Sequence, residues 1–115
     1  MSLMALMAGL SLSGAQQAQG GLMSYEAVVR CSGLTQAASE LEGGESGQGR
    51  RLSDAALYWS LTTIQAAQAS GRPAAQVDGD QTRARIRAVR ELATNVASAA
   101  RDELQRCLQR TPDLG

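Results

Sequence analysis

The sequence DQTRARIRAVRELATNVASAARDELQRCLQR, residues 80–110, decides the fold. Its apolar residues recur at intervals of three or four positions, which places their side chains on one face of an α-helix. This stripe consists of Ile86, Val89, Ala93, Val96, Ala100, Leu104 and Cys107. No glycine or proline interrupts it. The stretch therefore predicts an amphipathic helix whose apolar stripe ends in one of the chain's two cysteines.

A first helix is expected over residues 24–42. Ser24 is a good N-cap, because its hydroxyl can accept a hydrogen bond from a free backbone N–H of the first turn. The inner stripe of this helix would consist of Val28, Cys31, Thr35, Ala38 and Leu41. A glycine-rich loop is expected to follow over residues 42–51.

A second helix is expected over residues 52–70, with Ser53 as its N-cap. One row of its face contains Leu57, Leu61, Ile64 and Ala67, and the adjacent row contains Ala56, Trp59, Thr63 and Ala66. Together the rows make a wide apolar face, typical of a helix packed between two others. Trp59, the only tryptophan, is predicted to be a core anchor; the alternative is a platform for stacking a ligand.

The third helix, over residues 73–110, is either whole or broken once. Gly71 fits the C-cap of the preceding helix, and Pro73 fits the first position of this one. A break is compatible with the sequence near Gly79 or near Asn95. Because no strand signal is present, the fold class is all-α: a bundle of three or four helices forming a single domain over residues 24–115.

The N-terminal residues 1–23 differ from the rest of the chain. An apolar run of about ten residues has the length of a signal-peptide core and is too short to span a bilayer. Ser13, Gly14 and Ala15 then provide small residues for a cleavage site. No basic residue precedes the run, so the alternative is a disordered N-terminal arm. A signal peptide would place the mature protein in the periplasm or outside the cell.

Cys31 and Cys107 both belong to stripes that are expected to face the core. An even number of cysteines, a signal-like start and a small core together favour a disulfide between them. In an antiparallel bundle the start of the first helix lies near the end of the last, so the pairing is geometrically feasible. The alternative is a cytoplasmic protein with two buried thiols.

The charges balance, with eleven basic and eleven acidic residues. This balance argues against a dedicated nucleic-acid-binding protein. The one basic cluster lies along the 80–110 stretch and offers a possible interaction surface, made of Arg83, Arg87, Arg90 and Arg101. Intramolecular pairing with the acidic residues of the first helix would explain the same cluster.

The chain contains few side chains suited to catalysis. The chain contains no histidine, which removes the commonest general base and the commonest metal ligand. Asp102 and Glu103 are adjacent and point to different sides of a helix, so they cannot act together on one substrate. We expect no enzymatic activity, no metal site and no cofactor.

The order Cys31, Trp59, Gly71, Cys107 after a signal-like start resembles small exported helical proteins of GC-rich proteobacteria that contain two cysteines. It is also loosely similar to the periplasmic acid-stress chaperones of the HdeA type, although the cysteines are further apart here. The expected function is an exported helical module that binds a protein partner or a second copy of itself. The alternatives are an acid-stress chaperone and a cytoplasmic helical adaptor.

Overall fold

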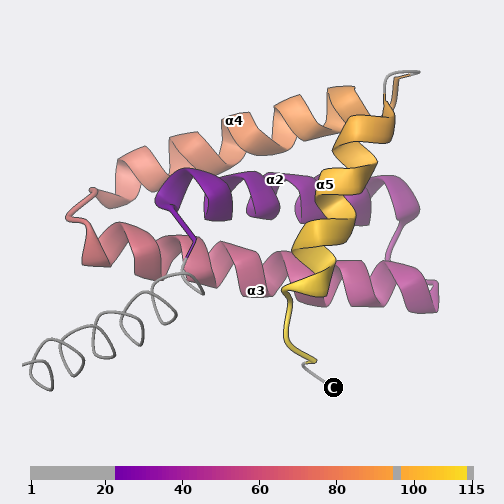
Figure 1. Ribbon diagram of the computed structural model, residues 1–115, viewed down its shortest axis with the longest axis horizontal. Helices are drawn as coiled ribbons and strands as arrows, with labels where there is room; N and C mark the ends of the chain where they lie inside the picture. The colour runs from indigo at the N-terminus through magenta and orange to yellow at the C-terminus, as the bar shows by residue number, and fades with distance from the viewer. Residues whose placement is uncertain (1–22, 95–96, 114–115) are drawn as a thin grey trace, which may run out of the picture.

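The computed structural model describes residues 23–94 and 97–113, which contain four helices and no strand. The helices are α2 (Tyr25–Glu42), α3 (Gly47–Ala69), α4 (Ala74–Leu92) and α5 (Ala97–Gln109) (Figure 1). The prediction of a small all-α bundle held by one disulfide is confirmed, in its four-helix form. The predictions for the N-terminal segment and for Val96 lie outside the described residues, except that Met23 packs against the core.

Helix α2 is the centre of the bundle. It lies between α3 and α4, and α5 crosses it steeply (Figure 1). Because three helices cover it, α2 is buried on several sides and has no single apolar face. Its buried residues are mostly small: Val28, Cys31, Ser32, Gly33, Leu34, Thr35, Ala37 and Ala38. The N-cap is Ser24, as predicted, with its Oγ accepting a hydrogen bond from the N–H of Ala27 at 3.1 Å.

Gly33 lies where the backbones of α2 and α4 come close together. A Cβ added to Gly33 would lie 2.6 Å from both the backbone carbon and the backbone oxygen of Ala84. Real Cβ atoms do not approach backbone so closely, and a backbone atom cannot rotate away as a side chain can. The glycine therefore sets the distance between the two helices.

Helix α3 begins at Gly47, so the predicted loop is wrong in its second half. Ser46 is the N-cap, and its Oγ accepts a hydrogen bond from the N–H of Gly49 at 2.9 Å. Ser53, the predicted cap, lies within the helix with its Oγ 2.8 Å from Oγ of Ser39. Glycine is a poor helix former, which misled the prediction. A Cβ on Gly49 would collide with the carbonyl group of Gly43, so the tight connection between α2 and α3 needs a glycine here.

The α3–α4 connection follows the predicted helix-ending pattern. Gly71 has a φ of 72°, in the left-handed region that favours glycine. The N–H of Arg72 donates to the carbonyl of Ala67 at 2.9 Å, and the N–H of Gly71 donates to that of Gln68 at 3.3 Å. These two bonds make a Schellman motif. Pro73 is the N-cap of α4, one position before its predicted place.

The third predicted helix is two helices. Helix α4 ends at Leu92 and α5 begins at Ala97, so the break near Asn95 is confirmed and the break near Gly79 is wrong. The hydroxyl of Thr94 donates to the carbonyl of Glu91 at 3.0 Å. Such a local side-chain bond competes with the helical backbone pattern.

Several apolar residues predicted to face the core lie outside it. Leu57, Leu61 and Ile64 are 59%, 51% and 43% exposed, so the structure packs only the row of α3 that contains Trp59, together with Ala67. Leu41 and Ile86 are 52% and 39% exposed, and Ala93 is also exposed. Helix α2 covers one side of α3, and α4 contacts α3 at Ser60. Among the described residues, no helix covers the side of α3 that contains Leu57, Leu61 and Ile64 (Figure 1).

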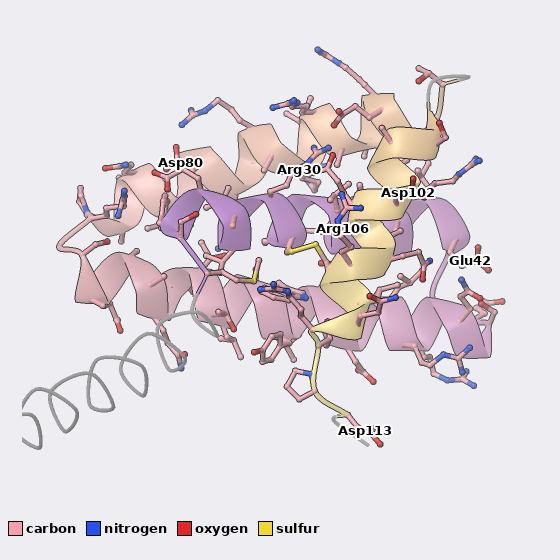
Figure 2. All side chains as sticks on the ribbon, in the orientation of Figure 1. Arg30, Glu42, Asp80, Asp102, Arg106 and Asp113 are labelled. Carbon is pink, nitrogen blue, oxygen red and sulfur yellow. A yellow bond between two sulfur atoms is a disulfide. The ribbon has the colours of Figure 1, made fainter. Side chains whose placement is uncertain are left out.

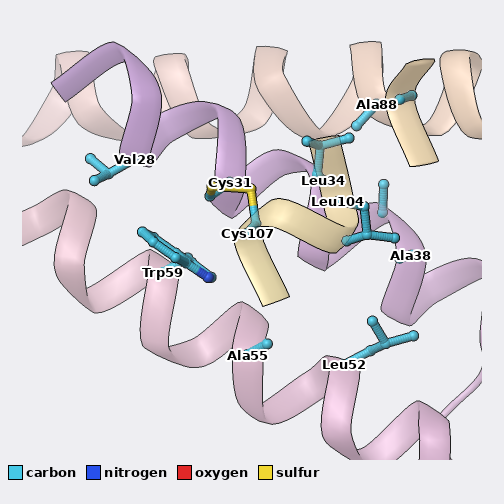
Figure 3. Close-up of a cluster of buried hydrophobic side chains, with 12 residues drawn as sticks. Val28, Cys31, Leu34, Ala38, Leu52, Ala55, Trp59, Ala88, Leu104 and Cys107 are labelled. Carbon is cyan, nitrogen blue, oxygen red and sulfur yellow. A yellow bond between two sulfur atoms is a disulfide. The ribbon is translucent and has the colours of Figure 1, made fainter. Parts of the chain in front are cut away.

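The core lies around a disulfide between Cys31 and Cys107, whose Cα atoms are 5.5 Å apart (Figure 3). It joins α2 to α5, as predicted. Trp59 from α3 lies close to this bond and is only 2% exposed. Its indole N–H donates to Oγ1 of Thr111 at 2.8 Å, so the one polar atom of the ring is satisfied by the segment after α5.

We expect Gly33→Ala to destabilise the protein by about 1–3 kcal/mol or more, because the added methyl overpacks the contact with the backbone of Ala84. Gly79→Ala is the matched control within α4. There the nearest atoms belong to the mobile guanidinium of Arg83, so the gain in helix propensity, up to about 1 kcal/mol, should dominate. Urea unfolding of both variants measures the difference. Equal effects would contradict a close α2–α4 contact.

Candidate functional site

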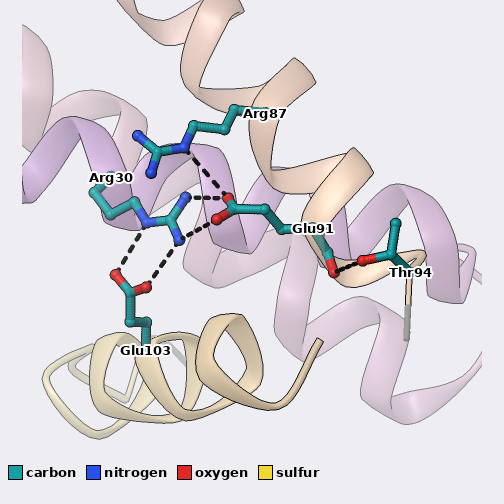
Figure 4. Close-up of polar contacts among 5 residues, drawn as sticks. All are labelled: Arg30, Arg87, Glu91, Thr94 and Glu103. Atoms are coloured by element: carbon teal, nitrogen blue, oxygen red, sulfur yellow. Dashed lines mark hydrogen bonds and ion pairs between the residues drawn. The ribbon is translucent and has the colours of Figure 1, made fainter. Parts of the chain in front are cut away.

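Arg30 connects three helices through two carboxylates (Figure 4). Its Nε and Nη2 donate to Glu103 of α5 at 3.0 and 2.9 Å, a bidentate pair. Its Nη1 donates to Glu91 of α4 at 2.6 Å, and Nε of Arg87 lies 3.6 Å from that carboxylate. Arg30 itself is on α2. The cluster therefore holds both α4 and α5 on the central helix.

The protonation states in this cluster favour ion pairs. Hydrogen bonds from Arg30 lower the pKa of Glu103, against an opposing effect of burial. The hydrogen bond with Glu103 raises the pKa of Arg30 above its ordinary value. A catalytic acid or base needs a pKa close to the working pH. These shifts move both groups away from neutral pH, which is the behaviour of a structural ion pair.

A second polar cluster ties the start of α2 to the start of α4. The hydroxyl of Tyr25 donates to Asp80 at 2.7 Å, and the guanidinium of Arg72 stacks on the Tyr25 ring, 3.9 Å from its centroid. Arg72 also pairs with Glu26 at 3.4 Å. Burial and the hydrogen bond to Asp80 raise the pKa of Tyr25 to about 12. The phenol therefore stays protonated at neutral pH and continues to donate this bond.

The four predicted interaction-surface arginines do not form one row. Arg83, Arg87 and Arg90 lie exposed on α4, whereas Arg101 lies on α5 beyond the helix break. Arg83 pairs with Asp80, and Arg87 pairs with Glu91. Arg90 and Arg101 have no ion-pair partner among the described residues. That this surface binds a partner stays a prediction.

The alternative of intramolecular pairing accounts for part of the charge pattern. Arg85 pairs with Glu40 of α2 at 3.3 Å, as complementarity between the first and long helices requires. The sequence pattern did not predict the Arg30 cluster. It predicted that acidic residues of the first helix pair with arginines of the later stretch, whereas here an arginine of α2 pairs with glutamates of α4 and α5. The sequence contained two signs of this cluster. Arg30 is the only basic residue in the first helix, and it directly precedes Cys31, which places it at the edge of the inner stripe.

An open hollow of about 470 Å³ lies beside the disulfide. Figure 2 shows Arg30 and Arg106 there, from α2 and α5. Arg110 also lines it, so the hollow is basic, although Glu103 contributes one acid. Within residues 23–94 and 97–113, no three side chains are grouped as a metal site would require. The same ranges contain no helix that is both long and apolar enough to cross a membrane.

The most unusual surface is the outer face of α3, defined by Leu57, Leu61 and Ile64. All three are large, apolar and at least 43% exposed. Their spacing of four and three residues places them on one side of the helix, opposite Trp59. In addition, α3 and its end carry no charged residue from 55 to 71. Exposed helix faces ordinarily carry charged or polar side chains, so the outer face of α3 is unusually apolar for an exposed helix face.

We expect Glu103→Gln to lower the free energy of unfolding at neutral pH by about 1 kcal/mol, since the carboxylate is partly exposed. The pKa of Glu103 is lower in the folded protein than in the unfolded chain, so the unfolded chain binds more protons as the pH falls. The contribution is therefore complete above the ordinary value of 4.5 and is lost as the pH falls through the folded-state pKa.

Asp102→Asn is the control for this variant, because Asp102 is exposed and has no partner among the described residues. Urea unfolding of both variants between neutral pH and pH 3 measures the effect. A Glu103→Gln effect that is as large at pH 3 as at neutral pH, or an equal effect of Asp102→Asn, would contradict the assignment.

Comparison with known proteins provides no relative from which a function can be transferred. No family model matches the chain, and neither the curated proteins nor the solved structures gave a match.

Proposed function

We propose that the protein is a non-enzymatic helical interaction module of an oxidising compartment, the periplasm or the extracellular space. Its partner is a protein that presents an uncharged, apolar helix face, and its docking surface is the outer face of α3. The single observation that carries this proposal is the exposure of Leu57, Leu61 and Ile64 on an uncharged stretch of helix.

The chemistry of this face favours a protein partner over other classes. Nucleic acids and anionic lipid surfaces are bound through clustered Lys and Arg, and residues 55–71 contain neither. An apolar helix face, by contrast, docks side chains at spacings of three and four residues against a matching face. Leu57, Leu61 and Ile64 have this spacing.

The disulfide supports the proposal that the protein belongs to an oxidising compartment. The cytosol keeps thiols reduced, whereas the periplasm and the extracellular space allow disulfides to persist. The Cys31–Cys107 bond lies in the core and joins two helices. A cytoplasmic adaptor would have to fold around two thiols at this position, with no covalent link between α2 and α5.

The acid-stress chaperone is a second candidate, which one observation favours. Glu91 and Glu103 fasten α4 and α5 to Arg30 of α2. Protonating Glu103 would weaken the contact between α5 and Arg30 and would loosen the packing of α5 on the core. An increase in the fluorescence of an apolar dye at acidic pH, together with reduced aggregation of a client protein, is expected only for this candidate.

Photo-crosslinking in the native cell tests the docking surface. A photoreactive residue placed at Leu57, Leu61 or Ile64 should give the same covalent adduct, because the three share one face. Placed at Leu41 or Ile86, which are also exposed and apolar but lie on other helices, it should not. Sequencing of the crosslinked peptide should identify an uncharged apolar helix. No adduct at the three positions, or equal adducts at all five, would contradict the proposal.

A further inference from the structure

We infer that the partner of the outer face of α3 is a second copy of this chain, packed with its α3 antiparallel to the first. This inference rests on the proposed function, since it names the occupant of the same surface. It follows from the spacing of the apolar residues, from the distribution of charge along α3 and from the position of α3 in the bundle.

The spacing along the outer face is that of a helix–helix seam. Asp54, Leu57, Leu61, Ile64 and Gln68 are separated by steps of three, four, three and four residues. An alternation of this kind keeps the side chains on a narrow line along which two helices pack. The apolar part is short and continuous, and it is bounded by a polar residue at each end. A seam of this length matches another of the same length.

The charges at the ends of α3 select the antiparallel arrangement. In a parallel pair, Asp54 would face Asp54 of the second copy, and Arg50 would face Arg50. In an antiparallel pair with Leu61 beside Ile64 of the second copy, Leu57 lies beside Gln68, and Asp54 lies beside Gly71, at the far end of the uncharged stretch. The uncharged residues 55–71 of the two copies then cover each other. The antiparallel arrangement therefore avoids the two like-charge contacts that the parallel arrangement would create.

Two-fold symmetry makes each contact count twice. In an isologous interface the contact of Leu61 with Ile64 of the second copy recurs as the contact of Ile64 with Leu61. The pair also supplies what the sequence pattern indicated, a helix packed between two others. Among the described residues, α3 packs on α2 through the Trp59 side and meets α4 at Ser60, whose Oγ donates to Oε1 of Gln81 at 2.9 Å. The neighbour on the outer face would be α3 of the other copy.

The layers of the fold leave room for this pairing. Helix α3 lies at the edge of the bundle: in Figure 1 α2 runs between α3 and α4, and α3 meets α4 directly at Ser60 and Gln81. The segment after α5 reaches α3 on the core side, where Thr111 meets the indole of Trp59. The three apolar residues remain at least 43% exposed, so a second α3 can approach without displacing a described element.

Sedimentation velocity of the purified full chain tests the inference. The native protein should show a monomer–dimer equilibrium, and Leu61→Glu should weaken it by about tenfold to a hundredfold, because a half-exposed leucine is lost from each copy. Leu41→Glu is the matched control, since Leu41 is 52% exposed and Leu61 is 51% exposed. Leu41→Glu should dimerise like the native protein. Circular dichroism should show that both variants remain folded.

Mixing two variants tests the identity and direction of the partner helix. Leu61→Glu and Ile64→Arg should each be mostly monomeric, and an equimolar mixture should form a heterodimer, because the antiparallel pair places residue 61 beside residue 64. A parallel pair, in which residue 61 faces residue 61, would instead restore association when Leu61→Glu is mixed with Leu61→Arg. That second result, without the first, would overturn the antiparallel arrangement.

The outcomes separate this inference from the proposed function. A native chain that stays monomeric over the whole accessible concentration range would overturn the inference, as would equal effects of Leu61→Glu and Leu41→Glu. If photo-crosslinking at Leu61 then gave an adduct with a different protein, the docking surface would stand and only its occupant would be wrong. A monomeric chain with no adduct at Leu61 would overturn both.

Discussion

The bond between Cys31 and Cys107 is the constraint on which the rest of the structure depends. Helix α5 has 13 residues, a length at which an isolated helix is marginal in water. Its buried residues, Ala100, Leu104 and Cys107, offer little apolar surface. The disulfide closes a separation of 76 residues, which in the chain-entropy model stabilises the fold by roughly 4 kcal/mol. Arg30 and Trp59 then orient α5 through Glu103 and Thr111.

The small apolar area of the core also explains the exposed face of α3. The central helix α2 buries small residues such as Ser32, Gly33 and Ala37, which let α4 approach closely but contribute little apolar area. A bundle of this size buries a limited fraction of its surface. One side of α3, anchored by Trp59, is enough to complete it. Leu57, Leu61 and Ile64 therefore stay exposed in the single chain, which is the basis of the association proposed above.

Helical periodicity predicted the fold class, the disulfide and the inward position of Cys31, Cys107 and Trp59, because core residues recur at fixed spacing. It failed where local and tertiary effects compete. Gly47 and Gly49 read as loop, although the contact with Gly43 requires a glycine within the helix. Leu57 and Ile64 read as core, because periodicity shows that a face is apolar but not which molecule covers it. The Arg30 cluster depends on how α4 and α5 cross α2, which one-dimensional spacing does not contain.

Hydrogen exchange of the oxidised and the reduced protein tests most directly whether the disulfide is the governing constraint. With the bond intact, the amides of α5 should be protected together with those of α2, since the two helices are covalently joined. After reduction under native conditions, the amides of residues 97–109 should lose protection first, while α2, α3 and α4 retain most of theirs. Unchanged protection of α5 after reduction would contradict the account, because the non-covalent contacts alone would then hold the helix.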